Sequence, residues 1–238
     1  MPAVPDGVRV YAIGDIHGMA RLLKTLLKTI KRDLKGYEGR SEIVFLGDYI
    51  DRGPDSAAVI ERLCEGPGPG DAWICLKGNH DAFLSDTMYA EKLNSRYYRA
   101  WVEQGGLEAM LSWGVDRATV YGDPDEAVAA LRKAMPKPHR KFFRKLKSSY
   151  QTGDYMFVHA GVRPHIDLDD QQEKDLLWIR EDFLKHRKDF GAHIVHGHTI
   201  FEDVDAQRNR TGVDTGAYKT GKLSALVLEG KTRRVLST

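Results

Sequence analysis

Short apolar runs and longer amphipathic segments alternate over the first third of the chain. Apolar-rich runs at residues 8–13, 42–46 and 72–76 predict buried strands. Between the first two, residues 19–34 carry apolar side chains every three or four positions and basic side chains on the opposite face, which predicts an amphipathic helix. Residues 54–64 predict a second helix with a proline in its first turn. This alternation predicts an α/β fold whose strands lie side by side in one sheet.

The middle of the chain follows a different pattern. Residues 82–149 have helical spacing, interrupted at Gly105-Gly106 and again at residues 122–124. We expect this segment to form a mostly helical insert that packs on one side of the sheet. The chain length and its 42% hydrophobic content suit one core. We therefore expect a single domain over residues 1–238 that contains this insert.

The strand pattern resumes in the last third of the chain. Apolar runs at residues 154–158 and 194–195 predict two further strands. The tail carries two more runs, at residues 223–228 and 232–236, on either side of a turn at Gly230. This arrangement predicts a β-hairpin.

Five short blocks combine Asp, Asn or His with glycine, and each of the first four directly follows a predicted strand. The blocks are Gly14-Asp15-Ile16-His17-Gly18, Gly47-Asp48-Tyr49-Ile50-Asp51-Arg52-Gly53, Gly78-Asn79-His80-Asp81, His159-Ala160-Gly161 and His196-Gly197-His198-Thr199. Loops that leave neighbouring strands of one sheet lie close together, so these blocks can supply ligands to one point. Carboxylate, imidazole and amide groups together suit divalent metals. The blocks therefore predict a two-metal hydrolase of phosphate esters.

Six side chains are the candidate ligands, and they suffice for two ions if the carboxylate of Asp48 is shared. They are Asp15, His17, Asp48, Asn79, His159 and His198. Taken alone, each has a simpler explanation, since Asp caps loops, Asn favours turns and a single His often belongs to the core. The recurrence of five blocks at predicted strand ends favours the metal site. For His196, two residues before His198, we favour a structural role over ligation.

Composition and charge bear on the partners and the cellular location that we expect for the protein. The net charge of +2 argues neither for nor against nucleic acid as a partner, so we predict no specific nucleic-acid binding. The start of the chain has no signal-peptide pattern and no apolar stretch is long enough to span a membrane, so we expect no membrane association and a cytoplasmic location. We expect Cys64 and Cys75 to be buried free thiols.

The blocks resemble the calcineurin-like metallophosphoesterase superfamily. The longer block, residues 47–53, resembles more narrowly the phosphoprotein phosphatase family, and Asp214-Thr215-Gly216-Ala217 resembles the closing motif of its bacterial members. The resemblance implies the metallophosphoesterase fold, a central β-sandwich of mixed sheets flanked by helices. It also implies a bacterial type of serine/threonine protein phosphatase.

The resemblance implies a role for each matching residue. The first metal would be held by Asp15, His17 and Asp48, and the second by Asp48, Asn79, His159 and His198. His80 would be the general acid, and Asp51 would orient it. The phosphate would be bound by Arg52 and Arg180. For Arg180 the alternative is a surface ion pair with neighbouring Glu181 or Asp182. One departure is Asp81, where eukaryotic members carry Glu and bacterial relatives tolerate Asp.

The expected chemistry is in-line attack on phosphorus by a metal-bound hydroxide, with His80 protonating the leaving alcohol. We expect two divalent ions, manganese first and iron or zinc as alternatives. The expected substrate is a phosphorylated protein or a small phosphoester, with serine/threonine preference. Alternatives are a symmetrical diadenosine tetraphosphatase and a tyrosine-directed phosphatase. A scaffold that binds metal without catalysis is disfavoured because His80, Asp51 and Arg52 are all present.

Two further features have both a functional and a structural explanation. The segment from Arg132 to Lys147 is strongly basic, with Phe142 and Phe143 in its middle. It is either a surface that attracts acidic phosphopeptides, nucleotides or polyphosphate, or a solvated helix face whose two aromatic side chains pack inward, and we favour the second. Trp101, Trp113 and Trp178 are candidates for a substrate groove, but core packing is the commoner use of Trp.

Overall fold

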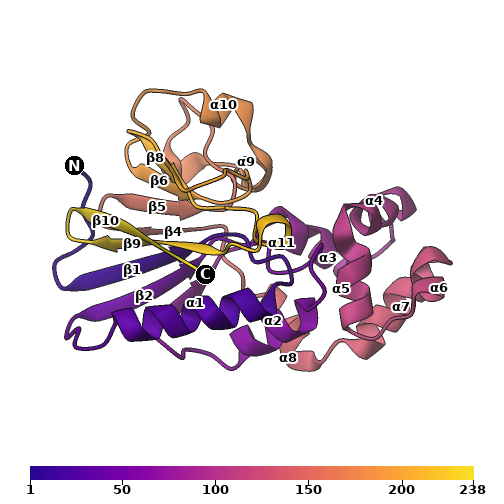
Figure 1. The fold of residues 1–238 in the computed structure, drawn as a ribbon. Helices are drawn as coiled ribbons and strands as arrows, with labels where there is room; N and C mark the ends of the chain where they lie inside the picture. Colours follow the sequence, from indigo (N-terminus) through magenta and orange to yellow (C-terminus); the bar gives the residue numbers. More distant parts are fainter.

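Two five-stranded sheets form the centre of the computed structural model, which describes residues 1–238 (Figure 1). The first sheet has the order β10-β9-β1-β2-β3. Its strands are β1 (Val8–Ile13), β2 (Arg40–Phe45), β3 (Ala72–Cys75), β9 (Ser224–Glu229) and β10 (Thr232–Ser237). The first three strands run parallel, and β9 and β10 form the expected antiparallel hairpin beside β1.

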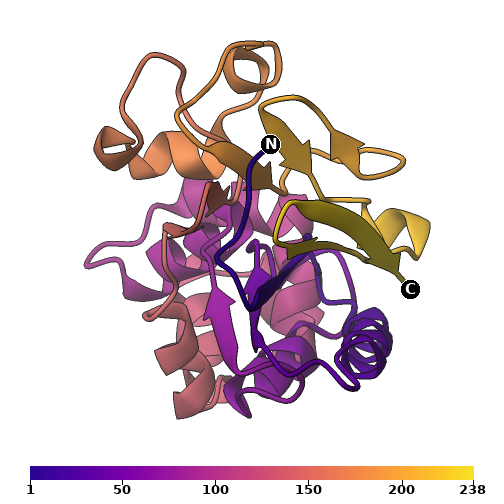
Figure 2. The ribbon, with the colours of Figure 1, turned by 90° about the vertical axis from the view of Figure 1, so that its left-hand side faces the viewer.

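The second sheet stacks on the first and has the order β4-β5-β6-β8-β7. Its strands are β4 (Ser149–Thr152), β5 (Tyr155–Val158), β6 (His193–His196), β7 (Asp205–Ala206) and β8 (Arg210–Gly212). The strands β5, β6 and β8 run parallel, while β4 and β7 are antiparallel edges. The expected sandwich of mixed sheets flanked by helices is therefore confirmed, and the two layers are visible end-on in Figure 2.

The two-residue period of a strand explains how the sandwich closes. In β1, Val10 and Ala12 point into the layer between the sheets, while Tyr11 and Ile13 point to the helices on the other side. The same alternation in β5 sends Phe157 into the inter-sheet layer. Both faces of the central strands are therefore buried, which is why these strands are almost continuously apolar.

Helices cover the outer face of each sheet. The first sheet is covered by α1 (Ala20–Asp33) and α2 (Ser56–Cys64) (Figure 1). The second is covered by α9 (Glu173–Trp178) and α10 (Glu181–Leu184), whose apolar side chains pack on β5 and β6. The short helices η2 (Leu168–Asp170) and α11 (Ala217–Thr220) lie in connecting loops. No helix is both long and apolar enough to cross a membrane.

The segment between β3 and β4 is helical, as expected, with shifted limits. Its elements are α3 (Asn79–Tyr89), α4 (Ser95–Trp101), η1 (Val102–Gly106), α5 (Leu107–Ser112), α6 (Arg117–Tyr121), α7 (Pro124–Ala134) and α8 (Lys137–Phe143). It begins three residues before position 82, because Asn79 and His80 already form the first turn of α3. The predicted break at Gly105-Gly106 is confirmed as a kink between two helical stretches, at which Gly105 adopts a non-helical φ of 112°. The break at residues 122–124 lies between α6 and α7, as expected.

Several short elements were not predicted from the sequence. The strands β4, β7 and β8 are two to four residues long and carry polar side chains, so they have no apolar run. Predicted strand limits also shift, since β2 begins at Arg40 and ends at Phe45 rather than spanning residues 42–46. That the chain forms one domain stays a prediction.

His193, the first residue of β6, links the two sheets. Its Nε2 atom lies 3.2 Å from Nη1 of Arg233 on β10, and Nε2 also lies 2.9 Å from the hydroxyl of Thr211. Burial, followed by the nearby Arg233 charge, lowers the pKa of His193 to about 4. An unfolded chain has an ordinary His pKa of about 6.5 and binds more protons between these two values. Stability therefore falls as the pH drops through this window.

The variant His193→Gln should lose part of this acid sensitivity, because glutamine cannot take up a proton. We expect the fall in the free energy of unfolding between about pH 6.5 and pH 4 to be about 1 kcal/mol smaller than in the parent, a figure reduced because the ring lines an open cavity whose water can partly solvate the charged form. Urea unfolding at a series of pH values measures it. Identical pH profiles for the two proteins would contradict the assignment.

Candidate dimetal site

The five blocks converge on the carboxylate of Asp48. It lies after β2, and the loops after β1, β3, β5 and β6 approach it from both sheets. The Oδ2 atom of Asp48 lies 3.4 Å from Nε2 of His17 and 3.5 Å from Nε2 of His159. Two groups of buried potential ligands, each within 4.8 Å, share this residue: His17, Asp48 and His80, and Asp48, His159 and His198. One shared carboxylate between two sets of histidines is the arrangement that a pair of metal ions requires.

Backbone strain is concentrated in the same loops. Six residues other than glycine have left-handed φ angles, and five of them belong to the blocks: His17, Asp48, Asp51, Arg52 and His198. Such conformations are unfavourable for residues with a Cβ, and they persist where the surrounding structure fixes them. The backbone strain therefore lies in the loops that carry the candidate ligands.

Backbone carbonyls determine which nitrogen of two histidines is free. Nδ1 of His17 lies 2.8 Å from the carbonyl of Ile50, and Nδ1 of His159 lies 2.9 Å from that of Leu46. A carbonyl oxygen only accepts, so each Nδ1 carries the proton and donates it. The Nε2 lone pairs of both rings therefore face the site, as in histidines that bind metals.

Two of the candidate ligand nitrogens, on His159 and His198, face no hydrogen-bond donor. Nε2 of His159 lies 2.9 Å from Oδ1 of Asn79, which places two acceptors face to face. Nε2 of His198 is buried and has no hydrogen-bond partner. Lone pairs in this arrangement are costly to bury unless a cation lies among them. The residues present therefore fit bound metal ions.

The protonation states point the same way. Burial lowers the pKa of His17 to about 3 and that of His198 to about 2, which keeps both imidazoles neutral, the form that can bind a metal. Burial, followed by the neighbouring Asp214 and Asp48 carboxylates, raises the pKa of Asp15 well above its usual range. Burial also raises the pKa of Asp214 to about 6. Divalent cations would relieve the repulsion within this buried acidic cluster.

The structure places Asp15 beside the site rather than in either ligand group. Its carboxylate accepts a hydrogen bond from the backbone N–H of His198, at 3.2 and 3.1 Å to the two oxygens. A side chain at Gly197 would collide with the same carboxylate, so this close approach needs glycine. Ligation by Asp15 and by Asn79 stays a prediction.

His80 and Asp51 form a buried pair next to Asp48. Nδ1 of His80 lies 2.6 Å from Oδ2 of Asp51, which also accepts a 2.9 Å hydrogen bond from the indole of Trp101. Burial alone would lower the pKa of His80, but the carboxylates of Asp48 and Asp51 outweigh it and raise the value. This pair has the geometry of an acid and the carboxylate that orients it.

Asp81 holds backbone segments of the site in place through hydrogen bonds. Its buried carboxylate accepts hydrogen bonds from the backbone N–H groups of Asp48 at 2.8 Å, Gly78 at 2.9 Å and Tyr49 at 3.2 Å. It therefore ties the loop after β2 to the first turn of α3. The sequence marked Asp81 only as a departure from the eukaryotic pattern.

Arg52 lies between two histidines of the site. Its Nη1 atom donates to Nε2 of His17 and its Nη2 atom to Nε2 of His80, both at 3.0 Å. Its backbone N–H donates to the carbonyl of Gly105, at 3.1 Å, and any side chain at Gly105 would strike Arg52. The helical insert therefore fixes the position of Arg52.

Arg180 is exposed and donates to the hydroxyl of Thr199 at 3.2 Å, one residue after His198. Its charge contributes to the lowered pKa of His198, where burial and His159 contribute more. It forms no ion pair with Glu181 or Asp182, which pair with Lys185 and Arg163. The surface ion pair considered from the sequence is therefore wrong.

The other singled-out residues have mainly structural contacts. His196 is buried, with its Nε2 atom 3.2 Å from Arg210, and it belongs to neither ligand group. Trp101 and Trp113 are buried in the core, whereas Trp178 is 38% exposed and lies edge-on to Phe83. The hydrogen bond from Trp101 to Asp51 was not predicted, because the two residues lie 50 positions apart.

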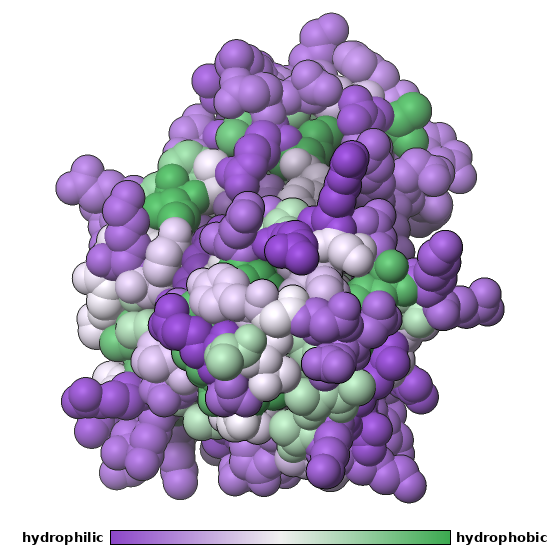
Figure 3. All heavy atoms as spheres, turned by 90° about the vertical axis from the view of Figure 1, so that its right-hand side faces the viewer, coloured by the Kyte–Doolittle hydropathy of each residue, from purple (hydrophilic) through white to green (hydrophobic).

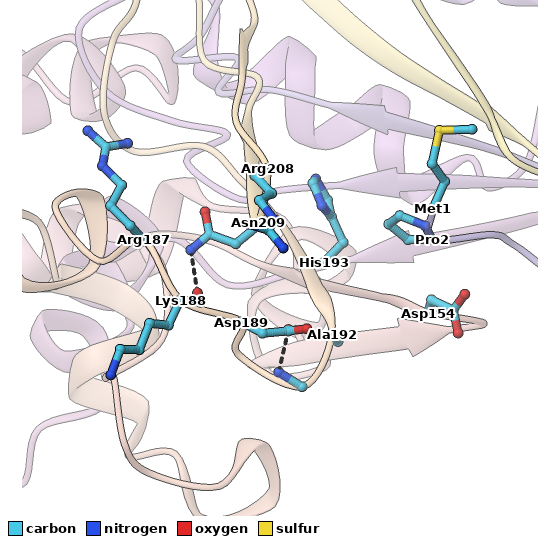
Figure 4. Close-up of a pocket in the computed structure, with 11 residues that line it drawn as sticks. Met1, Pro2, Asp154, Arg187, Lys188, Asp189, Ala192, His193, Arg208 and Asn209 are labelled. Atoms are coloured by element: carbon cyan, nitrogen blue, oxygen red, sulfur yellow. Dashed lines mark hydrogen bonds between the residues drawn. The ribbon is translucent and has the colours of Figure 1, made fainter.

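A cavity of about 670 Å³ lies away from this site (Figure 4). It is lined by both acidic and basic side chains, among them Asp154, Arg187 and Arg208. It includes His193 at the start of β6, whereas His198 follows the end of that strand. The cavity is therefore not part of the dimetal site.

Comparison with known families agrees with this geometry. Residues 8–221 match the profile of the family described as calcineurin-like phosphoesterase. The chain belongs to this family. Calcineurin-like phosphoesterases are metal-dependent hydrolases that use two divalent metals. The two ligand groups around Asp48 are thus a candidate dimetal site of this family.

Relatives within the family carry different names. The chain is 27% identical to serine/threonine-protein phosphatase 2 of Escherichia coli, over 90% of each chain. It is 33% identical to a symmetrical bis(5'-nucleosyl)-tetraphosphatase of an Acidovorax species, over 65% of this chain and 44% of the relative. A crystal structure described provisionally as a diadenosine tetraphosphatase matches with a TM-score of 0.64 and 22% identity, covering 97% of this chain and 92% of the other. That last likeness shows the fold.

The shared carboxylate should be indispensable for metal binding. We expect Asp48→Ala to lose both metals and nearly all phosphatase activity, because each ligand group depends on this oxygen donor. Metal content after dialysis and turnover of an aryl phosphate measure the two effects. The exposed Glu91→Gln is the matched control and should keep both. Retention of metal and activity in Asp48→Ala would refute the shared ligand.

Proposed function

We propose that this protein is a dimetal phosphomonoesterase that removes phosphate from serine and threonine side chains of proteins. The metals, with manganese as the first choice, would be held by Asp48 and the surrounding ligands. When bound, they would supply Lewis acidity to the phosphate oxygens and lower the pKa of a water molecule. The remaining chemistry is assigned to the side chains of the chain itself.

The Asp51–His80 pair is the observation that carries the proposal. A serine or threonine alkoxide is a poor leaving group and needs a proton as the P–O bond breaks. His80 has a raised pKa and a neighbouring carboxylate that stabilises its charged form, so it suits the role of that acid. Aryl phosphates and phosphoanhydrides release weaker bases and need such an acid far less. The pair therefore favours alkyl phosphoesters over both alternatives.

Arg52 and Arg180 would bind the phosphate. The guanidinium of Arg52 uses one N–H on each Nη atom for the two histidines, so it keeps N–H donors that no protein group accepts. A metal on Nε2 of His17 would release one further donor, the N–H of Nη1. A planar fork of this kind matches two phosphate oxygens. A phosphate that draws Arg52 away from Nε2 of His80 would also free that nitrogen to carry a proton. Substrate binding and activation of the acid would then be coupled.

Hydrolysis of dinucleoside tetraphosphates is the second candidate function. It is supported by the 33% identity to the symmetrical bis(5'-nucleosyl)-tetraphosphatase, although the match leaves out more than half of that relative. A tyrosine-directed phosphatase is the third, and its phenolate leaving group is a weaker base than an alkoxide, so it gives His80 less to do than a serine or threonine ester does.

A direct comparison of substrates tests the proposed function. The manganese-loaded protein should hydrolyse phosphoserine and phosphothreonine peptides with a higher kcat/KM than phosphotyrosine peptides or diadenosine tetraphosphate. The chelated protein is the control and should be inactive on all four. Anhydride cleavage that far exceeds ester cleavage would overturn the proposal in favour of the second candidate.

A mutation separates the role of the acid from that of the metal site. We expect His80→Ala to lower kcat on alkyl phosphates by about 10²–10⁴, because general acid catalysis contributes a factor of this size. The loss on aryl phosphates should be much smaller, since their leaving groups scarcely need protonation. Metal content should be measured in parallel. Equal losses on both substrates, at unchanged metal content, would remove His80 as the acid.

A further inference from the structure

Five basic side chains surround a cavity of about 640 Å³ on the helical insert. One lies near the end of α7 and the others lie along α8 or directly after it, opposite the last turn of α3: Arg132, Lys137, Arg140, Lys141 and Arg144. We call this the basic cavity. The face of the molecule that carries the insert helices is largely hydrophilic, with small apolar patches between the polar side chains (Figure 3).

The charge of the basic cavity is not balanced within the protein. No acidic residue lines it. None of its five basic side chains belongs to an ion pair, whereas other basic residues such as Lys77 and Arg163 do. The Nε atom of Arg140 is buried and has no acceptor. Five like charges around one cavity repel one another and attract an anion.

The cavity is also held in shape by the protein. Nε of Arg132 donates to the backbone carbonyl of Met88 at 2.8 Å, and the hydroxyl of Tyr89 donates to the backbone carbonyl of Arg140 at 3.0 Å. The guanidinium of Arg144 lies 4.4 Å from the ring centre of Tyr89. On the inner face of α8, Phe142 packs on Tyr49 and Phe143 is buried, as expected. The basic side chains are therefore displayed by a packed helix.

The details favour an acidic polypeptide over a single phosphate or a nucleotide. The helix α8 follows Pro136 and has Pro138 in its first turn, and proline supplies no N–H to hold a phosphate. Arg144 covers one face of Tyr89, the aromatic ring on which a base would stack. The positive charge is spread around a wide cavity rather than focused on a point. Carboxylates spaced along an extended segment match this distribution.

The position of the cavity relates it to the dimetal site. His80 and Tyr89 lie on the same helix, nine residues apart, which corresponds to about 14 Å along its axis. An extended polypeptide covers about 3.3 Å per residue. A chain with its phosphorylated side chain at His80 would therefore reach the basic cavity after about four to five residues.

We propose that the basic cavity is a docking site for an acidic segment of the phosphoprotein substrate, about four to five residues from the phosphorylated side chain. The proposal rests on the proposed function, because it assigns the cavity to the same substrate. It would confer specificity through KM, since the cavity does not contact the reacting atoms.

Two charge-reversal variants test the docking site. Lys137→Glu combined with Lys141→Glu places two acidic side chains in the cavity at exposed positions of α8. Lys24→Glu combined with Lys28→Glu is the matched control, with the same charge change and spacing on the exposed face of α1. Both should turn over para-nitrophenyl phosphate at the parent rate.

The substrates are two phosphoserine peptides. One carries a run of four glutamates centred five residues from the phosphoserine, and the other carries glutamines at the same positions. The parent should show a KM about tenfold lower for the glutamate peptide, as expected from about two exposed charge pairs. The cavity variant should lose this difference at unchanged kcat, and the control should keep it. Equal KM values for the two peptides in the parent, or equal losses in both variants, would overturn the proposal.

Direct binding separates this proposal from the proposed function. Fluorescence anisotropy with a glutamate-rich peptide that lacks phosphate should show binding weakened about tenfold in the cavity variant alone. This result would support the docking site even if no phosphopeptide were hydrolysed, an outcome that would refute only the proposed function. No difference between variants would overturn the docking site. A single-stranded oligonucleotide that displaces the peptide at lower concentration than unlabelled peptide would reassign the cavity to nucleic acid.

Discussion

The carboxylate of Asp48 is the group on which the arrangement of the site depends. It is buried, and it faces histidines from both sheets, namely His17 after β1 and His159 after β5. A charge in this position is costly to bury unless cations lie beside it. The sandwich is built around that requirement, because the carboxyl ends of the parallel strands of both layers meet at Asp48. The left-handed backbone in these loops is the local strain that accompanies it.

The helical insert supports the site from one side. Trp101 holds Asp51 through a hydrogen bond, and the carbonyl of Gly105 holds the backbone of Arg52. Both contacts come from the end of α4 and from the kink at Gly105 that follows it. The insert thus positions Asp51, which pairs with His80, and Arg52, while its far end presents the basic cavity. The insert therefore contacts Asp51 and Arg52 in the candidate site and also carries the cavity that we propose as a docking site.

Features that arise from residues close together in the sequence were predicted, whereas features that depend on contacts between distant residues were not. The central strands and α1 were predicted because their apolar periods are strong and local. Strands β4, β7 and β8 were missed because they are short and polar and form only by pairing with a neighbour. Asp81 had no visible role in the sequence, yet its carboxylate joins two loops that lie 33 residues apart. Arg180 was assigned from a family resemblance, and the structure places it beside His198 rather than in a surface ion pair.

The sequence by itself determined the family, the order of the blocks and the chemical types of the candidate ligands, because each block is a local feature at the end of a strand. The tertiary structure decided which side chains share Asp48, which nitrogen of each histidine is free and how the insert supports His80. These features depend on contacts between distant positions, such as the hydrogen bond from His198 to Asp15 across 183 residues. No local pattern encodes such a contact, since it exists only once the two sheets have packed together.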